Sequence, residues 1–286
     1  MDPNVFFDNA IKKYNTWYKC IDKNAYNSEA IELFEKAKNV YLMNKDYNGA
    51  CSCYEWIIKC SLENIPDSYN DLTRIYEDYA NILMNKQINI QKSIELYNKA
   101  LNNYIENGQV SCIIRIKEKM ADYYTNQQEY TKAIKLYLDV KDMYYPDNKY
   151  GFQKISKILF ELYVQTNEYE NAFTIANNRI KMSTENLARF NLPNLVTDAI
   201  LCCMIFDKEL SETKFDHYLE AYPSISNSIE CTLLHNIFDA LDQGDLKLFE
   251  NGLKKYDLIH PLSHIYIKLL SQIKVNIVSG DNISLL

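Results

Sequence analysis

Apolar residues recur every three or four positions along most of the chain, which is the spacing of one face of an α-helix. The segment 107–146 shows this clearly. One apolar face precedes the polar residues 127–129 and a second follows them, formed in order by Ile113, Ile116, Met120 and Tyr124 and by Ala133, Ile134, Tyr137, Val140 and Tyr144. Asn107-Gly108 is typical of a turn, and Pro146 ends the second face because it offers no helical N–H. The segment predicts two antiparallel amphipathic helices.

The junction between these two helices is repeated along the chain. An aromatic or isoleucine residue stands three positions before a small residue in the pairs Tyr47/Ala50, Ile90/Ser93, Tyr130/Ala133 and Tyr169/Ala172. The copies lie about 40 residues apart, which is typical of stacked helical repeats. We expect the aromatic side chain, Tyr130 for example, to be buried as a wedge between helices, while the small residue lets the next helix approach closely.

The repeat predicts an all-α fold. We expect a TPR-like α-solenoid of antiparallel helix hairpins over residues 1–190. The repeat is lost further on, so we expect residues 191–286 to form a C-terminal helical bundle with a short flexible tail. The chain holds only 6 Gly and 6 Pro, which suits helices joined by short turns. The first helix is expected over residues 4–21, with Ser28 as the N-cap of the second.

Charge and composition narrow the class of partner. The 286 residues carry a net charge of −7, which argues against nucleic acid as the main partner. Eight acidic residues and two lysines lie between Asp207 and Asp242, so most of the net negative charge is in this segment. The apolar runs are too short to span a bilayer, and the N-terminus lacks the apolar region of a signal peptide. These features predict a cytoplasmic protein with reduced cysteines.

Catalytic motifs have little support in the sequence. No glycine-rich phosphate loop is present, and His260 and His264 flank Pro261 without a neighbouring carboxylate ligand. We therefore expect a protein that is not an enzyme and that needs no cofactor or metal.

Several sequence blocks resemble one known family. The block 222–231 is followed by Leu233-Leu234 and by Phe249-Glu250-x-x-Leu253-Lys254-Lys255-Tyr256-Asp257. The segments 29–37, 104–108 and 131–137 extend the similarity towards the N-terminus. In order, spacing and total length these blocks resemble the soluble attachment proteins (SNAPs) of the N-ethylmaleimide-sensitive fusion (NSF) ATPase.

The resemblance implies an adaptor that binds the SNARE four-helix bundle through a basic face. The family's lysines correspond to Arg115 and Lys154. Lys119 and Lys157 lie one helical turn beyond them, on the same sides of their helices. An ordinary solvated helix face is the alternative interpretation of these four cations.

The resemblance also implies docking to a hexameric NSF-type ATPase and stimulation of its ATP hydrolysis. Glu230, Glu250 and Asp257 are the candidate docking residues, with Leu285 and Leu286 in the tail. Two acids that the family places in this region are replaced by Asn251 and Lys255, and only Asp281 remains of the acidic tail. Whether the altered C-terminus still stimulates the ATPase is therefore open.

Trp17 and Tyr18 occupy the region where the α type of the family contacts membrane, so weak contact with a membrane surface is one interpretation and a solenoid cap is the other. The choice between α and γ types stays open. The resemblance places the protein in the cytoplasm, associated peripherally with membranes through SNARE complexes. The main alternative is a generic TPR-like scaffold for other protein partners, in which the pattern reflects fold alone.

Overall fold

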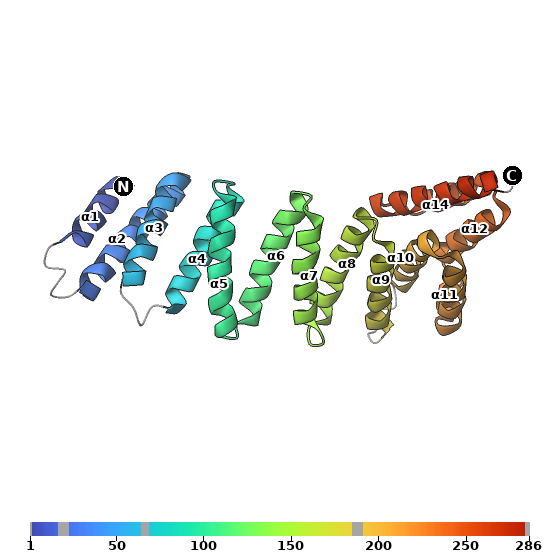
Figure 1. Ribbon diagram of the computed structural model, residues 1–286, viewed down its shortest axis with the longest axis horizontal. Helices are drawn as coiled ribbons and strands as arrows, with labels where there is room; N and C mark the ends of the chain where they lie inside the picture. The colour runs from blue at the N-terminus through green and yellow to red at the C-terminus, as the bar shows by residue number, and fades with distance from the viewer. Residues whose placement is uncertain (1, 17–22, 64–68, 185–190, 284–286) are drawn as a thin grey trace. The chain divides into compact units, whose positions relative to one another are not determined.

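The computed structural model describes residues 2–16, 23–63, 69–184 and 191–283, and these form fourteen α-helices without a β-strand (Figure 1). The chain divides into two compact units, Met1–Met120 and Ala121–Leu286. The all-α class is confirmed. The expected domain boundary near residue 190 stays a prediction.

The first unit contains five helices and the beginning of a sixth. They are α1 (Pro3–Tyr14), α2 (Lys23–Met43), α3 (Tyr47–Glu63), α4 (Tyr69–Asn85), α5 (Ile90–Glu106) and the first part of α6 (Val110–Asn126). Helices α1 to α5 pack in chain order, each against the next, as the hairpin pattern predicts (Figure 1). The second helix begins at Lys23, so Ser28 lies within it and is not its N-cap.

The second unit begins with the end of α6. It continues with α7 (Tyr130–Tyr144), α8 (Lys149–Gln165), α9 (Tyr169–Thr184), α10 (Leu192–Phe206), α11 (Lys208–Ala221), the short 3₁₀ helix η3 (Pro223–Ile225), α12 (Ile229–Gln243), α13 (Leu246–Asp257) and α14 (His264–Ile283). The last helix, red in Figure 1, packs against α8, α10, α12 and α13. This long-range packing differs from the neighbour-to-neighbour contacts of a simple repeat.

The small residues of the junction pattern lie in the packed interior. Ala50, Ser93, Ala133 and Ala172 are all completely buried, as the junction pattern predicts. The aromatic or isoleucine residues three positions earlier, including Tyr130, are only partly buried. The expectation that they form a buried wedge is therefore wrong. They lie at the edge of the packed surface and stay half-buried at the start of each helix.

A common turn precedes six of the helices. A left-handed backbone, with φ between 53° and 65°, is shared by Lys45, Gln87, Gly108, Gln128, Asn167 and Gly244. In each turn the next amide donates to the carbonyl five residues earlier at 2.9–3.0 Å, which is the Schellman pattern of helix ends. Gly108, Gly244 and Asn167 are of the residue types that adopt this backbone most readily, whereas Lys45, Gln87 and Gln128 are not. In the Asn107-Gly108 turn the asparagine has φ −91°, so it lies outside the left-handed region.

Tyrosine hydroxyls join neighbouring helices by hydrogen bonds to acidic or amide side chains. Tyr79 donates to Glu55 at 3.0 Å and Tyr97 donates to Asn81 at 2.7 Å. In the second unit Tyr137 donates to Asp122, and Tyr218 donates to Asn177. A buried hydroxyl needs such a partner, and the ring around it supplies a large apolar surface. These pairs help to explain why a chain with 24 tyrosines packs as helices.

This packing leads to a first prediction, which compares two tyrosines of the first unit. Tyr97 is 1% exposed, whereas the junction residue Tyr47 is partly exposed. Tyr97→Ala should lower the free energy of unfolding by about 3 kcal/mol, because it empties a buried aromatic site. Tyr47→Ala should cost about 1 kcal/mol. Urea titrations followed by circular dichroism measure both losses, and equal losses would show that the junction aromatics do support the core.

Candidate functional site

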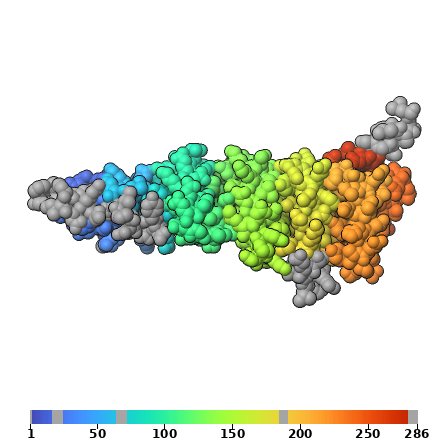
Figure 2. Space-filling model, turned by 60° about the horizontal axis from the view of Figure 1, so that its bottom comes forward, coloured from blue at the N-terminus to red at the C-terminus, as the bar shows by residue number. Residues whose placement is uncertain are grey.

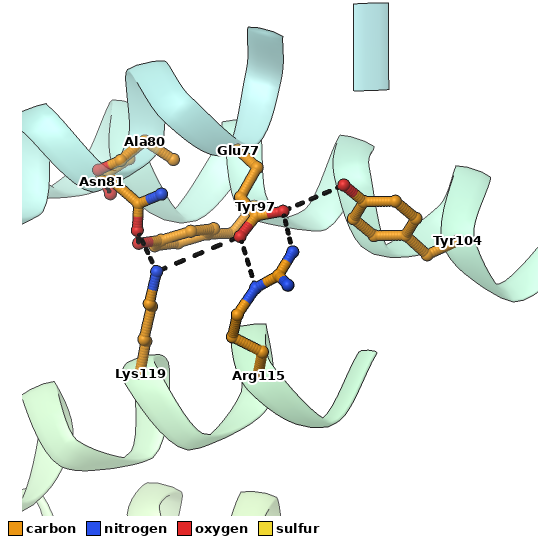
Figure 3. Close-up of polar contacts among 8 residues, drawn as sticks. Glu77, Ala80, Asn81, Tyr97, Tyr104, Arg115 and Lys119 are labelled. Atoms are coloured by element: carbon orange, nitrogen blue, oxygen red, sulfur yellow. Dashed lines mark hydrogen bonds and ion pairs between the residues drawn. The ribbon is translucent and has the colours of Figure 1, made fainter. Parts of the chain in front are cut away.

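Two of the predicted SNARE-binding cations, Arg115 and Lys119, lie one turn apart on α6 within the first unit (Figure 3). The Arg115 side chain is 49% exposed and that of Lys119 is 40% exposed. Both extend towards α4, which carries Glu77 and Asn81. They are thus partly open to a partner and partly engaged within the fold, unlike a freely solvated lysine.

Glu77 is the buried anion that engages Arg115. Its side chain is only 6% exposed. Arg115 donates to it twice, from Nε to Oε1 at 2.9 Å and from Nη2 to Oε2 at 2.7 Å, and the Tyr104 hydroxyl donates to Oε2 at 2.9 Å. Burial raises the pKa of Glu77, but the hydrogen bonds from Arg115 and Tyr104 outweigh it, and the pKa lies below its ordinary value. The carboxylate is therefore ionised at neutral pH.

Lys119 is held beside this ion pair by an amide. Its Nζ donates to Asn81 Oδ1 at 2.6 Å and lies 4.0 Å from Glu77 Oε1. The same Asn81 oxygen accepts the hydroxyl of Tyr97 at 2.7 Å, so α4, α5 and α6 are joined at one point (Figure 3). We call Glu77, Asn81, Arg115 and Lys119 the α4–α6 cluster. It presents two exposed cations over one buried anion.

Sequence reasoning did not identify Glu77 or Asn81. The two lie four residues apart, so they share a face of α4, and Arg115 and Lys119 show the same spacing on α6. The spacing is therefore matched between the helices. However, 38 residues separate each interacting pair, and the sequence alone does not say which faces meet.

The other two predicted cations, Lys154 and Lys157, lie on α8 in the second unit, and both are exposed. Lys157 Nζ is 4.0 Å from Glu161 one turn later, an exposed pair that contributes little to stability. Lys157 also lines a cleft of about 680 Å³ together with residues of α9, α10 and α14. At this position α8 offers positive charge on a rigid helix.

A largely buried ion pair is among the residues that line that cleft. Arg179 on α9 donates from Nη1 to Asp198 Oδ2 on α10 at 3.1 Å, and both side chains are largely buried. Burial raises the pKa of Asp198 to about 6, although Arg179 acts in the opposite direction. The pair joins α9 to α10 in the interior, so we regard it as part of the core of the second unit.

The predicted ATPase-docking acids have different surroundings. Glu230 is 8% exposed near the start of α12, so its carboxylate is hardly accessible to a partner. Glu250 is exposed and forms an ion pair with Lys274 of α14 at 2.8 Å. Asp257 accepts the amide of Leu262 at 2.9 Å and so fixes the loop between α13 and α14. Glu250 and Asp257 are therefore both exposed on α13, whereas Glu230 is buried.

The remaining acids of the segment 207–242 form an accessible surface. Seven of the eight are exposed, all except Glu230. In Figure 2 the orange surface to which α11 belongs is open on the face shown. Asp207 additionally caps α11 by accepting the amide of Leu210 at 2.8 Å. This segment supplies negative charge for a basic partner.

Four predicted site residues lie outside the described residues, namely Trp17, Tyr18, Leu285 and Leu286. Among the described residues, no helix combines the length and apolar character needed to cross a membrane. In the same ranges no three His, Cys, Asp or Glu side chains gather as metal ligands would.

Comparison with known proteins agrees with the resemblance. The family model described as "Soluble NSF attachment protein, SNAP" matches residues 1–278. The beta-soluble NSF attachment protein of Bos taurus is 23% identical over 88% of this chain and 84% of its own length. The probable vesicular-fusion protein sec17 homolog of Neurospora crassa is 22% identical over 99% of this chain and 98% of its own length.

Among solved structures, a signal transduction ATPase of Pyrococcus horikoshii with a tetratricopeptide repeat sensor aligns with 96% of this chain and 44% of its own chain, at 15% identity and a TM-score of 0.46. The family model covers nearly the entire sequence, and the two relatives match it along most of their own length. The chain therefore belongs to the family of soluble NSF attachment proteins.

Proposed function

We propose that the protein is an adaptor that binds SNARE complexes and recruits an NSF-type hexameric ATPase, which disassembles them in vesicle fusion. Membership of the SNAP family supports this proposal, as does the name of the fungal relative, which refers to vesicular fusion. The protein itself acts without catalysing a reaction and associates with membranes through its SNARE cargo.

The observation that carries the proposal is the placement of cations on helices. Arg115 and Lys119 are fixed on α6 by partners on α4, and Lys154 and Lys157 project from α8. Cations held in place by a rigid scaffold attract an acidic helical bundle and keep its register. A chain with a net charge of −7 would otherwise repel such a bundle.

The ATPase would dock on the acidic segment and its neighbours. Seven exposed acids between Asp207 and Asp242 and the exposed Glu250 lie on α11, α12 and α13 or at their ends. These helices pack within one unit, so force from the ATPase would act on a connected set of helices. A generic scaffold for other partners is the alternative, and it requires no affinity for either component.

We expect the double variant Lys154→Glu, Lys157→Glu to bind a soluble SNARE complex at least tenfold more weakly. Both side chains are exposed, so the fold should persist and the helical circular-dichroism signal should stay unchanged. Binding by the original chain should also weaken with salt, because charges are screened over about 8 Å at physiological ionic strength.

The matched control for this double variant is Lys132→Glu, Lys135→Glu on α7, which changes the net charge equally at exposed positions. It should bind nearly normally. Full binding by the α8 variant, or equal losses in both, would contradict a specific cargo face on α8.

Docking of the ATPase can be tested at Glu250 without losing its ion pair. The exchange Glu250→Lys with Lys274→Glu reverses the charge on α13 but keeps the attraction between the two side chains. We expect unchanged stability and SNARE binding, with recruitment of the ATPase to the SNARE complex reduced several-fold. Sedimentation of the ternary complex measures this, and normal recruitment would remove Glu250 from the docking surface.

The tail is proposed to act after docking. Deletion of Leu285 and Leu286 should leave SNARE binding unchanged but reduce adaptor-stimulated ATP hydrolysis, measured as phosphate release. The original chain provides the reference. If it already fails to stimulate hydrolysis, the proposed role of the tail is wrong and the protein is an adaptor that binds without activating.

A further inference from the structure

The α4–α6 cluster contains a feature that a purely electrostatic cargo site would not need. The negative charge of Glu77 cancels the positive charge of Arg115. Together with Lys119 the three side chains therefore carry a net charge of +1, whereas Arg115 and Lys119 without Glu77 would carry +2. For attraction of an acidic partner, an anion at this place is unfavourable. A buried carboxylate at a cargo site therefore requires another explanation.

The geometry of the ion pair supplies one. A guanidinium group is planar and has five N–H donors on fixed edges. Glu77 occupies the edge formed by Nε and Nη2, at 2.9 and 2.7 Å. Figure 3 shows the third nitrogen of Arg115 pointing away from Glu77. Glu77 does not occupy the other edge, which is formed by Nη1 and the second Nη2 hydrogen. The Arg115 side chain is 49% exposed.

We propose that Glu77 is a positioning residue that clamps the inner edge of Arg115 and leaves its outer edge oriented to receive a carboxylate of the acidic partner through two hydrogen bonds. This rests on the proposed SNARE binding and specifies its chemistry at this point. Arg115 would lie between two carboxylates, one buried in the adaptor and one from the cargo. The paired geometry favours a carboxylate over diffuse negative charge.

Clamping also reduces the cost of binding. A long side chain loses rotamer freedom when it is immobilised at an interface, which weakens binding by about three- to tenfold for each such residue. Here that freedom is already restricted in the absence of cargo, since two hydrogen bonds, at 2.9 and 2.7 Å, join Arg115 to the buried Glu77. Lys119 is restrained in the same way through Asn81 at 2.6 Å.

The variant Glu77→Gln separates positioning from charge because the two models predict changes of opposite sign. It keeps the shape of the side chain but removes the negative charge. If charge alone mattered, loss of the anion would tighten SNARE binding. The repulsion between Glu77 and an acidic group of the cargo about 8 Å away in water corresponds to about a twofold change in affinity. If Glu77 positions Arg115, binding should weaken by about three- to tenfold.

Arg115→Lys provides a second, independent test. Lysine retains the positive charge and can still pair with Glu77, but it has no second planar edge. We expect this variant to bind nearly as weakly as Arg115→Ala. A charge-only site would accept lysine without loss.

Tyr104→Phe is the matched control for disturbance of the fold. It removes one hydrogen bond to Glu77 but leaves both bonds from Arg115 in place. Its SNARE affinity should be normal. The thermal unfolding of all variants, followed by circular dichroism, establishes that each is folded at the temperature of the binding measurement.

The experiment is a titration of fluorescent soluble SNARE complex with the full chain and its variants at one fixed salt concentration. Weaker binding by Glu77→Gln and Arg115→Lys, with normal binding by Tyr104→Phe, is the expected result. Three results would each overturn the positioning role of Glu77 but leave the proposed SNARE binding intact. They are equal or tighter binding by Glu77→Gln, full binding by Arg115→Lys, and a loss in Tyr104→Phe as large as that in Glu77→Gln. Absence of binding by the original chain would overturn the proposed function as well.

Discussion

Close approach of successive helices at small residues is the constraint on which the rest of the structure depends. Ala50, Ser93, Ala133 and Ala172 are completely buried where one helix meets the next. A larger side chain at such a position would force the helices apart, because protein interiors are already densely packed. The close contact also brings polar groups of neighbouring helices within hydrogen-bonding distance, as between Tyr97 and Asn81.

The same interhelical contacts connect stability to function in the first unit. Arg115 is both a stabilising partner of the buried Glu77 and a candidate contact for cargo. Removing it would leave a buried carboxylate without its main counterion, which costs stability as well as binding. Lys154 and Lys157 on α8 lie on an exposed surface and lack such a role in the core. Charge changes on α8 therefore report on binding more cleanly than changes at Arg115.

The sequence was sufficient for the fold class because periodicity and small residues are local signals. The helices beginning at Tyr47, Ile90 and Tyr169 start where the pattern places them. The left-handed turns at Gln87 and Gln128 were not foreseen, since neither residue type favours that backbone. Ser28 was misplaced as a cap because the second helix begins five residues earlier.

The candidate site was predicted only in part, because its decisive contacts join distant segments. Arg115 and Lys119 were identified, but their partners Glu77 and Asn81 lie 38 residues away on another helix. Glu230 was proposed for docking from its sequence block, yet its helix face turns inward and buries it. A family resemblance aligns residue types along the chain, and it does not reveal which of them face solvent.

The most direct test of the central claim is reconstituted SNARE disassembly, with NSF-type ATPase, ATP and this protein as the only adaptor. Loss of fluorescence transfer between labelled SNARE helices reports their separation. We expect ATP-dependent disassembly that requires the adaptor. An intact complex in the presence of the adaptor, when an established adaptor of the family supports disassembly under the same conditions, would contradict the proposed function.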